Sequence, residues 1–196
     1  MKDLIFATKN KGKLKEIQSI LGDRFNVKSM EEVGISDDIL EDGKTFEENA
    51  IKKATEIMKK TGNIVLADDS GLEIDFLDKA PGVYSARYMG EETPYEIKNA
   101  KILELLKDVP EEKRTARFIS VIAMAIPSKE PIITKGTIEG IIGYEIKGEN
   151  GFGYDPIFYI PHLQKTSSEL TLEEKNKISH RGKALFEMKA ILEEMF

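Results

Sequence analysis

Short continuous apolar runs alternate along this chain with longer segments in which apolar residues recur every three or four positions. The continuous runs predict β-strands, and they cover residues 4–7, 63–67, 117–126 and 132–134. The segments with helical spacing predict amphipathic helices. Because strands and helices alternate, the pattern predicts an α/β fold with a mixed sheet, in which a β-rich middle is inserted between helical parts.

Local signals predict where several helices begin and end. Three Thr-x-x-Glu patterns, starting at Thr45, Thr93 and Thr171, are typical of capping boxes at helix N-termini. In the second, Pro94 is predicted at the first helical position. Ser179 is predicted to cap the last helix, and glycines at positions 22 and 62 are predicted to stop two others.

The most informative stretch is residues 66–71, Leu-Ala-Asp-Asp-Ser-Gly. It predicts a buried strand that ends in two carboxylates, with Gly71 allowing the chain to turn. Adjacent carboxylates after an apolar strand need compensation, and Mg²⁺ is suited to this because it prefers oxygen ligands. The alternative interpretation is a polar turn with both aspartates solvated.

A second informative stretch is residues 8–13, Thr-Lys-Asn-Lys-Gly-Lys, between the first strand and the first helix. A strand–loop–helix start of this kind gathers backbone N–H groups, a helix N-terminus and lysines, which suit phosphate. The glycine spacing is not that of a Walker loop. The alternative is a basic, solvated turn.

Composition limits the remaining choices. The 196 residues suffice for one substantial core or for two lobes that share a sheet. Cysteine is absent and only two histidines are present, so any metal is expected to be held by oxygen. The net charge of −6 argues against general nucleic-acid binding. The N-terminal apolar run is too short for a signal peptide and no run is long enough to span a membrane, so a cytoplasmic protein is expected.

Six blocks in order along the chain resemble the inosine triphosphate pyrophosphatase (Ham1-like) family. They are TKNKGK (8–13), TFEENA (45–50), ADDSGL (67–72), PGVYSARY (81–88), GFGYDP (151–156), and EEKN (173–176) leading into SHRG (179–182). Six blocks in family order are far more specific than any one of them. They extend from near residue 8 to near residue 185, so the resemblance spans essentially the whole chain.

The resemblance implies cleavage of a nucleoside triphosphate between the α- and β-phosphates, giving a monophosphate and pyrophosphate. It implies Mg²⁺, with Mn²⁺ as a substitute, and a preference for the deaminated purines in ITP, dITP and XTP. It also implies a single domain, residues 1–196, with an elongated central mixed β-sheet flanked by helices and a cleft between two lobes. A homodimer is expected, without a membrane or a stable nucleic-acid partner.

The resemblance also assigns roles to residues. The predicted metal ligands are Glu41, Asp68 and Asp69, and Asp69 is the predicted base that deprotonates the attacking water. Predicted phosphate-side residues are Thr8, Lys9, Asn10, Lys11, Gly12, Lys13, Lys53, Ser70 and Lys175. Predicted base-recognition residues are Phe152, Gly153, Tyr154, Asp155, His180 and Arg181, with Phe152 as a stacking face. Donors from Arg181 and His180 would favour a 6-keto oxygen over the amino group of adenine.

Several of the predicted base-recognition residues also have a structural interpretation. Phe152 and Tyr154 could belong to the core, and Tyr154 is the better candidate for that role. His180 and Arg181 could form a solvent-exposed helix start. Competing functions are a Maf-like nucleotide pyrophosphatase and a non-catalytic nucleotide-binding sensor, followed by a nucleic-acid binder.

Overall fold

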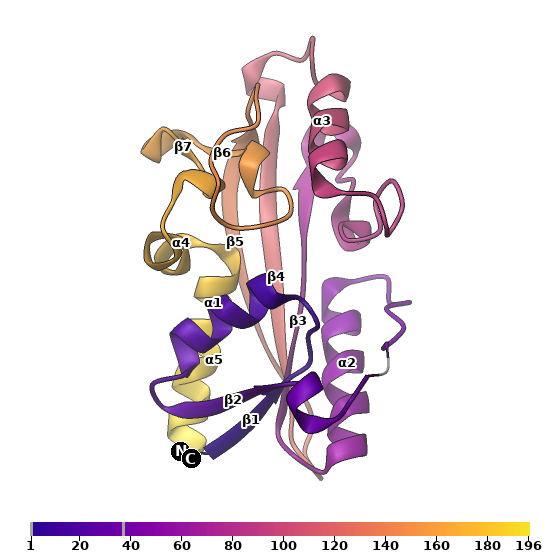
Figure 1. Ribbon diagram of the computed structural model, residues 1–196, viewed down its shortest axis with the longest axis vertical. Helices are drawn as coiled ribbons and strands as arrows, with labels where there is room; N and C mark the ends of the chain where they lie inside the picture. The colour runs from indigo at the N-terminus through magenta and orange to yellow at the C-terminus, as the bar shows by residue number, and fades with distance from the viewer. Residues whose placement is uncertain (1, 37) are drawn as a thin grey trace. The chain divides into compact units, whose positions relative to one another are not determined.

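The structure is a computed structural model that describes residues 2–36 and 38–196 (Figure 1). The helices are α1 Lys11–Leu21, α2 Phe46–Thr61, α3 Tyr95–Leu105, α4 Leu172–Ile178 and α5 His180–Met195. The strands are β1 Lys2–Phe6, β2 Phe25–Ser29, β3 Val65–Ile74, β4 Thr115–Ala125, β5 Ile132–Ile142, β6 Phe158–Ile160 and β7 Lys165–Thr166.

The strands form one seven-stranded sheet in the order β2-β1-β3-β4-β5-β6-β7. Strand β1 pairs in parallel with β2 and β3, whereas β6 pairs antiparallel with β5 and β7. The predicted α/β fold with a mixed sheet is therefore confirmed.

The chain divides into two compact units, and β3, β4 and β5 contribute residues to both. The first unit contains the chain up to Asp69, together with Ser120–Gly136 and His180–Phe196. Its core joins β1, α1, β2 and α5 to the buried side chains of Leu66 and Ile122. Within this unit α1 and α5 lie on one side of the strands and α2 on the other (Figure 1).

The second unit contains Ser70–Ile119 and Thr137–Ser179. Its core packs Ile102 of α3, and Leu106 just after α3, with apolar side chains of β3, β4, β5 and β6. Tyr154 belongs to this core, as its structural interpretation predicts.

Strand β3 differs from its prediction. It runs through Asp68, Asp69 and Gly71 to Ile74, so the predicted strand end at the carboxylates and the predicted turn at Gly71 are wrong. The two aspartates are buried in mid-strand, with 2% and 4% of their surface exposed. Asp68 is compensated by two cationic side chains and a hydroxyl group, whereas Asp69 has one lysine 3.9 Å away.

The helix signals are confirmed in part. Thr171 and Glu174 form both hydrogen bonds of a capping box at α4. Thr45 caps α2 through the Glu48 amide, but the Glu48 carboxylate accepts from the Lys44 amide instead of closing the box. The predicted box at α3 is wrong, because Pro94 is itself the N-cap residue and offers no side-chain hydrogen bond.

Glycines end two helices and allow one close approach. Gly22 follows α1 and Gly62 follows α2, as predicted, and Gly62 is left-handed with φ of 68°. A Cβ on Gly136 of β5 would lie 1.9 Å from the His180 backbone oxygen. The absence of a side chain at Gly136 therefore lets the first turn of α5 rest directly on the strand.

Among the described residues, no helix combines the length and apolar character that a bilayer span requires.

Candidate active site

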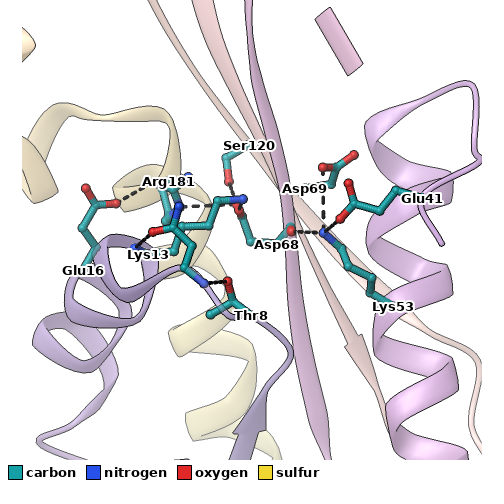
Figure 2. Close-up of polar contacts among 10 residues, drawn as sticks. Thr8, Lys13, Glu16, Glu41, Lys53, Asp68, Asp69, Ser120 and Arg181 are labelled. Atoms are coloured by element: carbon teal, nitrogen blue, oxygen red, sulfur yellow. Dashed lines mark hydrogen bonds and ion pairs between the residues drawn. The ribbon is translucent and has the colours of Figure 1, made fainter. Parts of the chain in front are cut away.

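Two neighbouring carboxylates on β3 form the centre of the candidate site in the first unit. Successive side chains of a strand point to opposite faces of the sheet. Figure 2 shows Asp68 directed toward Lys13, Arg181 and Ser120, and Asp69 directed toward Lys53 and Glu41. The residue pair therefore separates two polar clusters, one on each face of the strand.

Both oxygens of Asp68 are engaged. Oδ1 accepts a hydrogen bond from Ser120 Oγ at 2.6 Å and lies 3.4 Å from Arg181 Nε, while Oδ2 pairs with the Lys13 ammonium. Burial alone would raise the pKa of Asp68, but Arg181 and Lys13 more than offset it and hold that pKa well below its ordinary value. Asp68 is therefore a permanent anion that holds two cations in place.

Glu16 of α1 completes this cluster. It is buried and pairs with Nη1 of Arg181, 165 positions later in the chain. Burial lowers the pKa of Arg181, but the Asp68 and Glu16 carboxylates outweigh it and raise that pKa above its ordinary range. Glu16 was not predicted from the sequence, because no local spacing signals a contact with a residue so far along the chain.

The start of α5 is not exposed to solvent. His180 and Arg181 expose 4% and 2% of their surface, so the alternative of a solvated helix start is wrong. Cations at a helix N-terminus oppose the helix dipole. For Arg181 the two buried carboxylates offset that cost.

Asp69 occupies a different environment. Its Oδ1 lies 3.9 Å from Lys53 Nζ, and Lys53 also pairs with Glu41 and donates to the backbone oxygen of Asp68 at 2.7 Å. Burial, opposed by Lys53 and reinforced by Glu41, raises the pKa of Asp69 to about 6. A carboxyl group with such a pKa can exchange a proton near neutral pH.

The structure also bears on a metal ion. Within residues 2–36 and 38–196, no three Asp, Glu or His side chains converge as a ready-made metal site. Of the predicted ligands, Glu41 and Asp69 lie beside the same ammonium, whereas the oxygens of Asp68 are taken by its cationic partners. Oδ2 of Asp69 is buried and has no hydrogen-bond partner in the described part of the chain. An oxygen of this kind fits a Mg²⁺ ligand.

Residues 8–13 form the predicted strand–loop–helix start. Thr8 Oγ1 accepts from the Asn10 amide at 3.1 Å, and Asn10 Oδ1 caps α1 by accepting from the Lys13 amide at 3.0 Å. Lys11 and Gly12 form the first turn of the helix, and Lys9 pairs with Asp38 at 2.5 Å. This local folding aims a helix N-terminus at the end of β1, an arrangement suited to an anion.

The remaining predicted residues lie in the second unit. They are Ser70 on β3, Phe152, Gly153, Tyr154 and Asp155 in one loop, and Lys175 on α4. Asp155 Oδ2 accepts from the Phe152 amide at 2.9 Å and from Lys175 Nζ at 2.6 Å. The same ammonium lies 4.7 Å from the centre of the Phe152 ring. In this structure Lys175 therefore holds the loop that carries the predicted base-recognition residues.

Comparison with known proteins shows what this chain is similar to. The sequence model of the Ham1 family matches residues 4–191. A protein named dITP/XTP pyrophosphatase from Bacillus subtilis (strain 168) is 50% identical, over 98% of this chain and 98% of its own. One of the same name from Halalkalibacterium halodurans is 54% identical, over 94% of this chain and 96% of its own.

Solved structures agree with the sequence comparison. The Staphylococcus aureus Ham1 protein matches with a TM-score of 0.88 and 42% identity, over the whole of both chains. A HAM1 protein from Coxiella burnetii matches with a TM-score of 0.89 and 44% identity, over 99% of this chain and all of its own.

Proposed function

This chain belongs to the Ham1 family, and from that premise we propose that it hydrolyses the triphosphates of deaminated purines, ITP, dITP and XTP, to the monophosphate and pyrophosphate. Relatives named dITP/XTP pyrophosphatase share about half of its residues over nearly full length. The structural observation that carries the proposal is Asp69, a buried carboxyl group with a pKa of about 6 and an oxygen without a described partner.

Asp69 is the proposed general base. A water molecule attacks phosphorus at the α–β anhydride, Asp69 accepts its proton, and the bond to the bridging oxygen breaks so that pyrophosphate leaves. The raised pKa of Asp69 suits this role, because a base whose pKa lies near the working pH is both ionised and able to hold the proton.

The neighbouring cations supply charge for the phosphates. Lys13 and Lys53 each present an ammonium beside the carboxylates of β3, and the α1 N-terminus offers backbone N–H groups. Asp68 pairs with Lys13 and Arg181 on the face of β3 opposite to Asp69, so its proposed role is to hold these two cations. Thr8, Asn10 and Ser70 remain proposed hydrogen-bonding partners for phosphate oxygens.

A Mg²⁺ ion would be held by Asp69 and Glu41, and it would supply positive charge against the phosphate oxygens. The buried, unpartnered Oδ2 of Asp69 supports this assignment. Asp68 is a less suitable ligand, because Mg²⁺ would have to displace Lys13 or Arg181 from its carboxylate.

Recognition of the purine is proposed to fall to His180, Arg181 and the loop containing Phe152 and Asp155. Donors from His180 and Arg181 would bond the 6-keto oxygen, where adenine presents an amino group. We also propose that the protein is a homodimer and that residues 1–196 form a single catalytic domain, as the family resemblance implies. Sedimentation of the purified protein tests the dimer.

The decisive experiment is hydrolysis of ITP, XTP, dITP, GTP and ATP with Mg²⁺, with pyrophosphate and orthophosphate separated among the products. Pyrophosphate released mainly from ITP, dITP and XTP supports the proposal. Orthophosphate release contradicts it, and tight nucleotide binding without turnover favours a nucleotide sensor.

A further inference from the structure

The loop of residues 151–155, here called the base loop, carries all four base-recognition residues predicted in the second unit. It borders a cavity of about 240 Å³ whose lining includes Tyr95, Asn99, Phe152, Gly153, Pro156 and Ser168. Gly151 and Gly153 are both left-handed, with φ of 75° and 65°. On the side that faces this open pocket the base loop lacks packing contacts, although Tyr154 is anchored in the core. The position of the residues beside Tyr154 therefore depends on hydrogen bonds.

One of these hydrogen bonds comes from Asn99 in α3. The Asn99 side chain exposes 2% of its surface, and its Nδ2 donates to the Gly153 backbone oxygen at 3.0 Å. The Gly153 carbonyl lies between Phe152 and Tyr154 in the chain. Asn99 thus fixes the peptide unit between the stacking candidate and the buried tyrosine.

The amide of Asn99 is oriented by this single bond. Its Oδ1 is buried and has no hydrogen-bond partner among the described residues. A buried acceptor without a partner is costly. A residue used only to fill space at this position would not need the amide, so the amide is best explained by its bond to the base loop.

The elements around Asn99 make it a firm attachment point. Lys98, the preceding residue of α3, donates to the Ala86 backbone oxygen at 2.7 Å. Tyr154 OH donates to the Ser85 backbone oxygen at 2.6 Å, and the Tyr95 ring of α3 meets the Tyr154 ring edge-on at 5.1 Å. Helix α3 is therefore joined both to the base loop and to residues 81–88, a sequence block that has no role in the reaction proposed above.

We propose that Asn99 is a positioning residue for base recognition, holding the Gly153 carbonyl so that the base loop presents Phe152 and Asp155 to the purine. This inference rests on the proposed function, in which the base loop contacts the nucleobase. Of the phosphate-side lysines, Lys13 and Lys53 belong to the other unit, and Lys175 is held by its own bond to Asp155. Loss of the bond should therefore reduce discrimination between bases more than it reduces phosphate binding.

The test compares kcat/KM for ITP and for ATP in the full-length protein with Mg²⁺. Asn99→Leu removes the donor at nearly constant volume, and Asn99→Ala provides a second variant without a donor if the leucine protein does not fold. Each should lower the ITP-to-ATP ratio about fivefold, the equivalent of one hydrogen bond. Asn99→Gln keeps a donor and should restore part of the ratio, which a purely space-filling role would not predict.

Ser168→Ala is the matched control. Ser168 lines the same cavity, and its buried Oγ has no hydrogen-bond partner in the described part of the chain. Removing that hydroxyl changes the cavity without touching the bond to Gly153, so the ratio should stay at the wild-type value. An equal drop in Ser168→Ala would overturn the proposal, because it would show that the cavity, and not the bond, governs the ratio.

A second readout does not depend on turnover. The chain contains no tryptophan, so Phe152→Trp introduces a single tryptophan, which can be excited selectively over the six tyrosines. Combined with Asn99→Leu, this reporter should show about twofold stronger quenching by acrylamide than in the background with Asn99 intact. Unchanged quenching together with an unchanged ITP-to-ATP ratio would overturn the positioning role. Failure of the wild-type protein to release pyrophosphate would instead reject the proposed function.

Discussion

Replacing each of the two adjacent aspartates of β3 by asparagine should change stability in opposite directions. Asp69→Asn should stabilise the metal-free protein at pH 7, whereas Asp68→Asn should destabilise it. Both substitutions remove one buried carboxylate in the same strand at nearly constant volume. Only the neighbours differ, so each substitution is the control for the other.

The expected gain for Asp69→Asn follows from its pKa. The ordinary value is 3.8 and the folded value is about 6, so the folded state disfavours the ionised form. Each tenfold change in a dissociation constant is worth about 1.4 kcal/mol, which puts the cost of ionised Asp69 near pH 7 at about 3 kcal/mol. Asparagine does not ionise and avoids that cost. Because the cost accumulates as pH rises from 3.8 to 6, the advantage of Asp69→Asn should vanish near pH 4.

The expected loss for Asp68→Asn has the opposite origin. The substitution leaves Lys13 and Arg181 beside a neutral group, and breaking a buried ion pair in this way costs about 3–5 kcal/mol. Glu16 still pairs with Arg181, which favours the lower end of that range. The lowered pKa of Asp68 means that its stabilising effect is present above pH 3.8 and is lost only below it, so the deficit should persist at pH 5.

Urea unfolding in EDTA at pH 7, 5 and 4 measures both free energies of unfolding. Lower stability of Asp69→Asn than of the wild type at pH 7, or an advantage that is undiminished at pH 4, would show that burial does not disfavour ionised Asp69. Asp69→Asn should also lose pyrophosphate release while remaining folded. Near-normal turnover by the folded variant would exclude Asp69 as the base.

Three further outcomes are expected. At limiting Mg²⁺, the pH profile of kcat/KM should fall on the acid side as Asp69, with its metal-free pKa of about 6, becomes protonated, and a profile flat from pH 5 to 8 would contradict this. Saturating Mg²⁺ should move the fall to lower pH, because the cation and the proton compete for Asp69. Mg²⁺ at about one hundred times its dissociation constant should raise the free energy of unfolding of the wild type by about 2.7 kcal/mol, and that of Asp69→Asn by much less. An equal rise in both proteins would show that Asp69 is not a ligand. Gly136→Ala places a Cβ 1.9 Å from the His180 backbone oxygen and should lower the free energy of unfolding in urea by about 1–3 kcal/mol. In the control Gly143→Ala the nearest atoms lie 3.7 Å from the new Cβ, so the change should be small. Similar losses in the two variants would show that the contact with α5 is not the cause.

Much of the local structure could be predicted from neighbouring residues. The turn from β1 into α1, the stop at Gly62 and the capping box at Thr171 each depend on side chains within a few positions. The α3 start was mispredicted because a Thr-x-x-Glu pattern cannot show which residue adopts the cap conformation.

The site could be predicted less completely. The six sequence blocks contain Lys13, Asp68, Asp69 and Arg181, but they do not say which side chains meet. Glu16 and Asn99 lie outside these blocks. Glu16 pairs with Arg181 and Asn99 donates to the Gly153 backbone oxygen, and both partners lie far along the chain. Contacts of this range are set by packing, so periodicity and capping rules do not report them.

The sequence by itself determined the alternation of strands and helices, the family, and the residues near which chemistry is expected. Only the tertiary structure decided that two identical neighbours, Asp68 and Asp69, have opposite properties. The strand continues through both, so their side chains leave it on opposite faces. One face brings Lys13 and Arg181 against a carboxylate and lowers its pKa, while on the other face burial prevails over a single, shared lysine and raises the pKa of Asp69.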